Sequence, residues 1–427
     1  MPLAVIILTI VSIICSILYF PTIKIKNISF SSYWPIALIG AILLLLTNSV
    51  SINTVLDAFT ANNSLNPLKI LVLFISMTVL SIFLDEVGFF KCIATKAATI
   101  LNGSQMKLFI GFYVLISILT VFTSNDIIIL TFTPFICYYA KNSKINPIPY
   151  LVAEFVAANT WSMTLIIGNP TNIYLASAFN IGFLDYLKVM FIPTLIASLV
   201  SLAILYLLFR KQLKDKMEQT SQEENIKINT TLLIIGLVHL ITTTILIAIA
   251  SYINLEMWIV TLCFAISLIF TTSIYLLIKK ESFSILTRTL KRAPYSLIPF
   301  VLSMFVIVLA LNDTGITLKL SNLFNKINPI YSFGIGGALT ANLINNIPMS
   351  VLFANMNFTS NASIYASVIA SNIAAYITPV GALAGIMWMS LLKTYQVDFS
   401  FKKFVGYGII IGIPTLLAAL FTLSLII

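Results

Sequence analysis

Charged residues are scarce in this sequence. Only 9% of its 427 residues are Asp, Glu, Lys or Arg, whereas 59% are hydrophobic. A soluble domain of this size needs many more charged side chains to cover its surface. Apolar stretches of about 20 residues, the length of a membrane-spanning helix, recur along the chain. The sequence therefore predicts an all-α, polytopic membrane protein.

Metal ligands and reactive side chains are also few. The chain has one histidine, and its four cysteines lie far apart without CxxC spacing. This pattern argues against disulfides and against a zinc site. The sequence shows no nucleophile–base set and no phosphate-binding loop, so we expect no catalytic residues, no metal and no enzymatic activity. The only cofactor we expect is a coupling ion, H⁺ or Na⁺.

Most apolar segments have the length of a simple membrane span. They lie near residues 2–21, 33–52, 67–90, 187–209, 230–250, 256–278, 296–312 and 404–427.

Two regions of the first half have a different pattern. Residues 106–140 form two apolar arms that meet at Thr123-Ser124-Asn125-Asp126. Arms of about 15 residues are short for a full crossing, which favours a re-entrant hairpin. Residues 147–179 are interrupted by a Gly-Asn-Pro sequence, and glycine suits a helix end while proline suits a helix start. This pattern predicts a broken helix.

The same two patterns return in the second half of the chain. Residues 331–356 predict a hairpin and residues 363–392 a broken helix. Leu84-Asp85-Glu86-Val87-Gly88 matches Leu311-Asn312-Asp313-Thr314-Gly315, and the tip Asn125-Asp126 matches Asn345-Asn346. In the broken helices, Asn159 and Gly168 match Asn372 and Gly381. We predict two repeats of five crossings each, residues 1–209 and 230–427. An odd number of crossings inverts the second repeat, as in secondary transporters.

The basic residues indicate how the chain is oriented in the plasma membrane (the bacterial inner membrane). With two hairpins and ten crossings, one face receives all of the 24 Lys and Arg residues except Lys69, Lys188, Lys319 and Lys326. The positive-inside rule makes that face cytoplasmic. Both termini then lie outside, and the hydrophilic segment 210–229 is a cytoplasmic linker. The net charge of +10 is thus a topology signal and not a nucleic-acid site.

Polar residues at the predicted tips and breaks lie within apolar runs. Because the membrane offers them no water, they must line a protein-enclosed cavity or binding site. Tips and breaks also leave backbone N–H and C=O groups that attract anions and cations. We expect the two tips, entering from opposite faces, to meet near the centre. The candidate solute-binding and ion-binding residues are Ser124, Asn125, Asp126, Asn159, Thr160, Gly168, Asn169, Thr171, Asn172, Asn345, Asn346, Asn372, Thr378 and Gly381.

Two acids are candidates for coupling transport to an ion gradient. Asp126 is the only acid at a tip, and an isolated charge there costs about 2.5–3.5 kcal/mol, so it should be paired, cation-bound or protonated. Glu154 lies inside a span and is either a proton carrier or the acceptor of a structural hydrogen bond. Asp85, Glu86 and Asp313 lie at span ends, where we expect solvated or capping roles.

Several stretches resemble a known family. They are Leu84-Asp85-Glu86-Val87-Gly88-Phe89-Phe90, Asn125-Asp126 with Leu130-Thr131 and Pro134, Ile181-Gly182-Phe183, Ala293-Pro294, Asn345-Asn346 with Pro348, and Thr378-Pro379-Val380-Gly381 leading to Trp388. They resemble the arsenite-efflux permeases of the arsenical pump membrane protein family. That family lies within the ion transporter superfamily, which also contains sodium-coupled dicarboxylate and sulfate carriers. The resemblance implies two inverted repeats with a solute site between them.

The sequence departs from the permease pattern at two amides. Asn159, within Ala-Asn-Thr-Trp-Ser, and Asn372, within Ala-Ser-Asn-Ile-Ala-Ala-Tyr, stand where the permeases usually carry Asp. If those acids carry protons or shape the arsenite site, the specificity here could differ. The turn from Gly168 to Asn172 is also more similar to other branches of the superfamily, whereas Glu154 adds an acid that the permeases usually lack.

These features lead to one functional hypothesis and two alternatives. We expect a secondary active transporter of a small oxyanion or oxyacid, most specifically an antiporter that exports arsenite or antimonite in exchange for protons and so confers arsenical resistance. The alternatives are a sodium-coupled carrier of a dicarboxylate, citrate or sulfate, and a passive channel. Expected partners are the solute and the lipid bilayer, without nucleic acid. The resemblance favours a homodimer and leaves open an ATPase subunit, with which some arsenite permeases pair.

Overall fold

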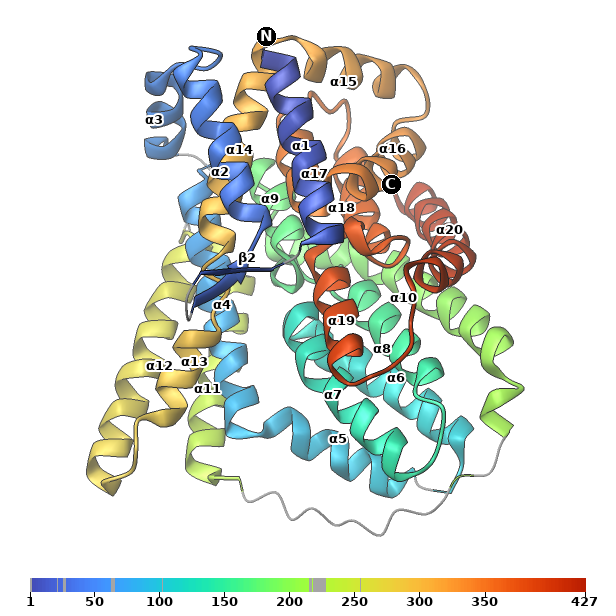
Figure 1. Cartoon of the computed structure of the whole chain (residues 1–427). Coiled ribbons are helices and arrows are strands. Elements are labelled where there is room, and N and C mark those ends of the chain that lie inside the picture. The colour runs from blue at the N-terminus through green and yellow to red at the C-terminus, as the bar shows by residue number, and fades with distance from the viewer. Residues whose placement is uncertain are drawn as a thin grey trace.

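A computed structural model describes residues 2–20, 22–25, 28–62, 66–101, 103–214, 217, 228–253 and 255–427. Helices account for nearly all of this structure (Figure 1), so the helical fold class expected from composition is confirmed. The predicted linker, 210–229, falls mostly outside the described residues, and only a short 3-10 turn at Gln212–Lys214 follows Arg210.

The first half of the chain contains a β-hairpin among its helices, with Thr22 paired to Ser31 in antiparallel register. The elements of this half are α1 (Pro2–Tyr19), β1 (Thr22–Ile25), β2 (Ile28–Ser31), α2 (Tyr33–Leu46), α3 (Ile52–Thr60), α4 (Pro67–Val87), α5 (Phe89–Ile100), α6 (Gln105–Val121), α7 (Asn125–Asn142), α8 (Ile148–Trp161), α9 (Pro170–Ala178) and α10 (Phe183–Phe209).

The second half contains helices that correspond in order and type to those of the first half. They are α11 (Thr230–Ala250), α12 (Met257–Lys279), α13 (Ser284–Arg292), α14 (Leu297–Asp313), α15 (Ile316–Lys326), α16 (Pro329–Ile344), α17 (Asn346–Ala354), α18 (Asn361–Ile373), α19 (Leu383–Thr394) and α20 (Phe401–Ile426).

The order of elements repeats from α1–α10 to α11–α20. The most specific match is the bend after α4 and after α14, where Gly88 (φ 92°) and Gly315 (φ 73°) adopt left-handed conformations that glycine takes without steric cost. Each glycine leads into a short helix, α5 or α15, and these lie at opposite ends of the molecule (Figure 1). Two oppositely oriented repeats would place them in this way.

Six helices of the described part are long and apolar enough to cross a bilayer: α4, α10, α11, α12, α20 and the segment Ser284–Asp313, which contains α13 and α14. Within its apolar window, α4 is 78% buried, whereas α11 is 28% buried and α12 is 33% buried. Therefore α4 is a central helix, and α11 and α12 keep one face free for lipid. Because lipid tails are as apolar as leucine, close packing and polar contacts hold such helices together.

Four short helices were not expected as separate elements. They are α3, α5, α13 and α15, which carry apolar side chains on one face only. In α5, for example, Phe90, Ala94 and Ala98 are buried while Lys91 and Lys96 are exposed. A search for continuous apolar runs overlooks such helices, because their apolar residues recur with helical spacing among polar ones.

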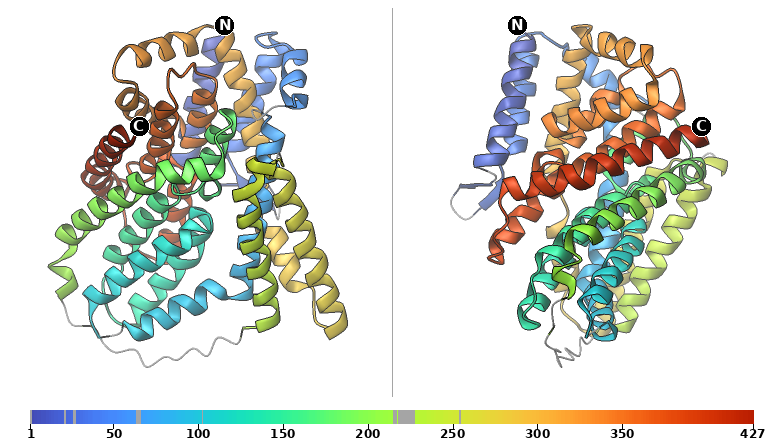
Figure 2. Two further views of the ribbon diagram at one scale, coloured as in Figure 1. Left: turned by 180° about the vertical axis from the view of Figure 1, so that it is seen from behind. Right: turned by 90° about the vertical axis from the view of Figure 1, so that its right-hand side faces the viewer.

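The hairpins and broken helices lie close to their expected bounds. α6 and α7 form the first hairpin, and α16 and α17 form the second, with Asn345 as the single residue between the two helices. The first broken helix is α8 and α9, separated by residues 162–169. The second is α18 and α19, separated by residues 374–382. The long helices α10 and α20 lie in contact, side by side in the right-hand view of Figure 2.

Candidate functional site

The first hairpin tip contacts the first broken helix. Asn125 begins α7, and its Nδ2 donates to Asn159 Oδ1 over 2.9 Å. Asn159 in turn donates to the Phe155 carbonyl one turn earlier in α8, over 2.8 Å. Both asparagines are buried, at 2% and 0% exposure. The tip is therefore fixed to its own repeat through one pair of amides.

The second tip makes the equivalent contact in its own half. Asn345 donates from Nδ2 to the Val380 carbonyl over 3.0 Å, and its Oδ1 accepts from the Ile347 N–H at the start of α17. Its φ of 77° costs a residue other than glycine about 1–3 kcal/mol. Next to it, Asn346 donates to the Ser371 carbonyl over 3.4 Å. Hydrogen bonds to the second broken helix thus support a strained turn.

The two halves meet through the broken helices. Asn372 of α18 donates to Asn172 Oδ1 over 2.7 Å, and its own Oδ1 accepts from Ser162 Oγ (2.8 Å) and Asn169 Nδ2 (3.1 Å). The Thr171 hydroxyl lies 3.0 Å from the Ser371 hydroxyl. All these side chains are buried. Asn372 is the centre of a polar cluster that spans both repeats.

The remaining contacts of this cluster stabilise the breaks. Asn169 Oδ1 accepts from the Thr171 N–H and caps α9. Asn172 donates to the carbonyls of Ser162 and Leu165 within the break. Thr160 donates to the Tyr376 hydroxyl over 3.4 Å, a second link between the repeats.

The glycines predicted at the breaks lie where two backbone segments approach each other. A Cβ on Gly168 would lie 2.1 Å from the Ser162 carbonyl oxygen, and one on Gly381 would lie 2.2 Å from the Ala374 carbonyl oxygen. Beside Gly381, Thr378 donates to Asn342 Oδ1 over 2.6 Å. The two breaks therefore share one steric requirement, although they lie in different halves of the chain.

The expectation that the two tips meet near the centre stays a prediction. Within the described residues, no hydrogen bond joins Asn125 or Asp126 to Asn345 or Asn346. Each tip uses its side-chain amide on its own broken helix. The three asparagines of the tips and Asn372 at the centre of the cluster are buried; the tip residues are Asn125, Asn345 and Asn346. Hydrogen bonds between the broken helices therefore join the two halves here, and each tip is bonded to the broken helix of its own half.

The two acids have different surroundings. The Asp126 side chain is half-buried in the first turn of α7, near Tyr33 of α2, and has no hydrogen bond or ion pair in the described part of the chain. Glu154 is completely buried, and both of its oxygens accept from Thr133 Oγ1, at 2.8 and 3.1 Å. The Trp388 indole lies near Glu154, but its N–H lacks a hydrogen bond of acceptable geometry among the described residues.

Some buried oxygens near the first tip lack a partner in the described structure. They are Ser124 Oγ, Asn125 Oδ1 and Thr78 Oγ1 of α4. Ser124 and Thr78 line a cavity of about 10 Å³, together with Ser81 and Thr123. A space of this size holds at most one water molecule. Met77, Phe122 and Ile167 complete its lining, so the cavity is partly polar and partly apolar.

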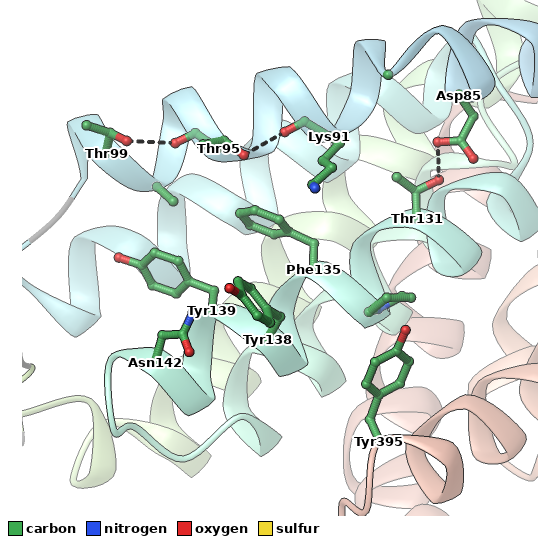
Figure 3. Close-up of a pocket in the computed structure, with 13 residues that line it drawn as sticks. Asp85, Lys91, Thr95, Thr99, Thr131, Phe135, Tyr138, Tyr139, Asn142 and Tyr395 are labelled. Atoms are coloured by element: carbon green, nitrogen blue, oxygen red, sulfur yellow. Dashed lines mark hydrogen bonds between the residues drawn. The ribbon is translucent and has the colours of Figure 1, made fainter. Parts of the chain in front are cut away.

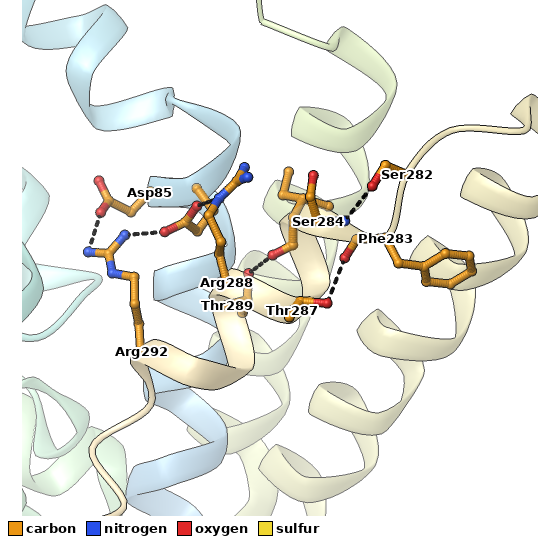
Figure 4. Close-up of polar contacts among 10 residues, drawn as sticks. Asp85, Ser282, Phe283, Ser284, Thr287, Arg288, Thr289 and Arg292 are labelled. Carbon is orange, nitrogen blue, oxygen red and sulfur yellow. Dashed lines mark hydrogen bonds and ion pairs between the residues drawn. The ribbon is translucent and has the colours of Figure 1, made fainter. Parts of the chain in front are cut away.

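A polar network that sequence reasoning missed lies at the end of α4 (Figure 4). Glu86 accepts from Arg288 Nε and Arg292 Nη1, both over 2.6 Å, while Asp85 Oδ2 accepts from Arg292 Nη2 over 2.7 Å. Asp85 Oδ1 accepts from Thr131 of α7 over 2.7 Å. Asp85 and Glu86 are therefore ion-paired, unlike the solvated or capping roles expected of them. The available signal was the spacing of the two arginines, four residues apart on one helical face.

Comparison with known proteins agrees with this fold and these motifs. The family model described as citrate transporter matches residues 28–368. The arsenical pump membrane protein of Escherichia coli (strain K12) is 30% identical over 375 residues, which cover 82% of this chain and 85% of that protein. The arsenical pump membrane protein of Yersinia enterocolitica is 27% identical over 375 residues, with the same two coverages.

A solved structure shows the same fold. The crystal structure of the Alcanivorax borkumensis YdaH transporter, described as having an unusual topology, superposes with a TM-score of 0.56 at 13% identity. The match covers 100% of this chain and 97% of that chain. The family model covers most of the chain, and the arsenical pump membrane proteins are similar over most of their length. The chain therefore belongs to the citrate transporter family of membrane transporters.

Proposed function

We propose that this protein is a secondary active transporter that exports arsenite or antimonite in exchange for protons. The observation that carries the proposal is the buried cluster around Asn372, to which both broken helices contribute amides and hydroxyls. An asparagine side chain offers both donors and acceptors, which matches a neutral oxyacid better than a fixed charge does. The arsenical pump membrane proteins among its relatives support the choice of cargo.

The hydrogen bonds of the cluster set a condition for binding. Both polar atoms of the Asn372 amide already have protein partners, Asn172 on one side and Ser162 and Asn169 on the other. A cargo molecule at this place must exchange for those partners. Such an exchange costs little when each lost hydrogen bond is replaced, and much when one group stays buried without a partner. This difference would give the site its selectivity for solutes with several hydroxyl groups.

Asp126 is the proposed coupling group. Without a hydrogen bond or counter-charge in the described residues, its carboxyl would be protonated or would hold a cation while it remains in the membrane interior. A proton taken up on one side and released on the other would link its state to the pH gradient. In this proposal both termini lie outside and the segment 210–229 is cytoplasmic, so the basic face is the one from which cargo leaves the cell.

A sodium-coupled carrier of citrate, a dicarboxylate or sulfate is the second candidate. Two observations favour it. The family model is described as citrate transporter, and the small cavity beside Ser124 holds two buried hydroxyl oxygens, Ser124 Oγ and Thr78 Oγ1, that lack a partner among the described residues. Hard cations prefer oxygen ligands of this kind. The two candidates differ in their driving ion and in the charge of their cargo.

Purified protein in proteoliposomes separates the candidates. Vesicles with an imposed pH gradient and no sodium are expected to accumulate arsenite against its concentration gradient, and the accumulation should stop when an ionophore removes the pH gradient. Sodium-driven accumulation of citrate without arsenite movement would establish the second candidate. Movement that only follows the solute gradient, under either ion gradient, would indicate a passive channel and overturn both.

A further inference from the structure

A cavity of 470 Å³ lies between α5 and α7, and Tyr395, which follows α19, closes one side (Figure 3). It shares no lining residue with the polar cluster around Asn372 or with the two tips. Its lining includes Lys91 of α5 and Asn142, which follows Lys141 at the end of α7. Both lysines belong to the basic face that is cytoplasmic in the proposed orientation. The cavity is therefore on the side from which exported cargo starts.

The cavity lies along the face of α7 that leads to Asp126. From Asp126 to Tyr138, the side chains of α7 that are not buried recur with helical spacing and form one stripe along the helix. The members of this stripe are Asp126, Leu130, Thr131, Pro134, Phe135 and Tyr138. The last four of them line the cavity, and Thr131 lies about one and a half helical turns after Asp126. A solute in the cavity is thus on the same stripe as the proposed coupling acid.

Three threonine hydroxyls of the lining have their protons engaged. On α5, Thr95 donates to the Lys91 carbonyl over 2.9 Å, and Thr99 donates to the Thr95 carbonyl over 3.0 Å (Figure 3). On α7, Thr131 donates to Asp85 Oδ1 over 2.7 Å. A hydroxyl oxygen that already donates its proton keeps lone pairs with which it accepts. Both walls of the cavity therefore offer hydrogen-bond acceptors to a solute.

These acceptors favour a neutral solute that carries hydroxyl groups. An anion would bring further lone pairs to threonine oxygens that can no longer donate, whereas a protonated oxyacid brings O–H donors. The charges of the lining give the same indication, because Asp85 and Lys91, its two charged side chains, have opposite signs. Arsenous acid, the neutral form of arsenite, has three O–H groups and fits this description.

We propose that the cavity between α5 and α7 is the cytoplasmic entry site of the transporter, where a small neutral oxyacid binds to the hydroxyl oxygens of Thr95, Thr99 and Thr131. The inference rests on the export function proposed above, since it concerns the same cargo. At 470 Å³ the space is large enough for such a solute together with water. The acceptors of the wall select the uncharged form before the cargo moves along α7 toward the first tip.

Binding of boric acid tests the entry site without a transport measurement. Boric acid is a neutral oxyacid that does not bind thiols, so the free cysteines of the chain do not interfere. It is added at millimolar concentration to the full-length protein in phosphatidylcholine nanodiscs, and its ¹¹B line width reports binding. Nitrate is the matched competitor, because it has the same planar shape but a negative charge and no O–H donor. We expect arsenous acid to displace boric acid and nitrate to leave it bound.

Threonine variants locate the acceptors. The double variant Thr95→Val with Thr99→Val keeps the shape of the α5 wall and removes two acceptors, so it should weaken boric acid binding about tenfold. Replacing both threonines with serine keeps the hydroxyls and should preserve binding. Thr287→Val is the matched control, because Thr287 is exposed on α13, donates to the Phe283 carbonyl in the same way and does not line the cavity. It should bind boric acid as the wild type does.

Arsenite transport by the same variants tests the role in entry. In proteoliposomes the double valine variant should raise the KM for arsenite about tenfold and keep the rate at saturation, because an entry site affects loading and not the later steps. An unchanged KM would overturn the entry role.

The binding outcomes are separate from those of the transport experiments. Absence of ¹¹B line broadening with the wild type, displacement of boric acid by nitrate, or wild-type binding by the double valine variant would each overturn the proposed site, even in a protein that transports arsenite. A protein that binds boric acid as expected and does not move arsenite would leave the binding site established and the proposed transport function rejected.

Discussion

Asn372 and Asn172 form the shortest side-chain hydrogen bond between the two broken helices: Asn372 Nδ2 donates to Asn172 Oδ1 over 2.7 Å. Both residues are 0% exposed and lie 200 positions apart in the sequence. Asn172 lies in the first turn of α9 and Asn372 in the last turn of α18, each next to a break where backbone groups also need partners. One amide pair therefore joins the repeats at the same place where cargo is proposed to bind.

Replacing Asn372, the centre of the polar cluster, should destabilise the protein. Asn372→Leu leaves Asn172 Oδ1 and Asn169 Nδ2 without their strongest partners. Each buried group left unsatisfied costs about 1–3 kcal/mol. We expect a lower unfolding temperature in detergent and loss of arsenite transport. Asn361→Leu is the control because it makes the same change at an exposed position of α18. Equal stability of the two variants would contradict the stabilising role of Asn372.

The glycines of the two breaks should be equally intolerant of a methyl group. Gly168→Ala and Gly381→Ala would each place a carbon atom about 2 Å from a backbone oxygen, which cannot rotate away as a side chain can. Both variants should fold less stably and transport more slowly, by a similar factor. Gly406→Ala in α20 is the control, since a Cβ there meets no atom within 4 Å. If only one of the two Gly→Ala variants lost stability and transport rate, the inference that both breaks share one steric requirement would be wrong.

Asp126 should be dispensable for folding and essential for coupling. Asp126→Asn changes no hydrogen bond or ion pair in the described structure, so the unfolding temperature should stay near that of the wild type. Transport in proteoliposomes should lose its response to the pH gradient. Asp185→Asn, at an exposed site where Asp185 pairs with Lys188, should keep the response. A wild-type pH dependence of Asp126→Asn would exclude the coupling role.

Glu154 should act as a structural hydrogen-bond acceptor and not as a proton carrier. It is fully buried, and within the described residues it bonds only to Thr133. Glu154→Gln keeps an acceptor for Thr133 and should transport with the same pH dependence as the wild type. Thr133→Val removes the hydroxyl that donates to Glu154 and should lower the unfolding temperature, at a cost of about 1–3 kcal/mol. Loss of proton coupling in Glu154→Gln would instead make Glu154 a proton carrier.

The ion pair between α4 and α13 should contribute measurably to stability. The Asp85 side chain is 9% exposed and that of Arg292 34% exposed, so solvent screens the pair only in part. A double-mutant cycle with Asp85→Asn and Arg292→Gln should give a coupling energy of about 1 kcal/mol. The same cycle at the solvent-exposed pair of Asp398 and Lys403 should give none. Equal coupling at the two sites would show that burial has no influence here.

Apolar runs and their interruptions were sufficient to predict the membrane fold. The broken helices were expected at 147–179 and 363–392, and they lie at 148–178 and 361–394. The signal was local: a bilayer requires about 20 apolar residues per helix, and glycine and proline mark where such a helix ends and restarts. The small amphipathic helices α5 and α13 gave no such signal, because they are neither long nor apolar throughout.

The sequence alone determined that this is a helical transporter with two similar halves, since composition, helix length and glycine positions are properties of the chain itself. Only the tertiary structure decided which polar groups meet. It joined Asn372 to Asn172, bonded each tip to the broken helix of its own half, and paired Asp85 with Arg292. The physical reason is that a buried amide or carboxylate needs a partner wherever it lies, but its spacing along the chain does not specify that partner. The packing of distant helices selects it.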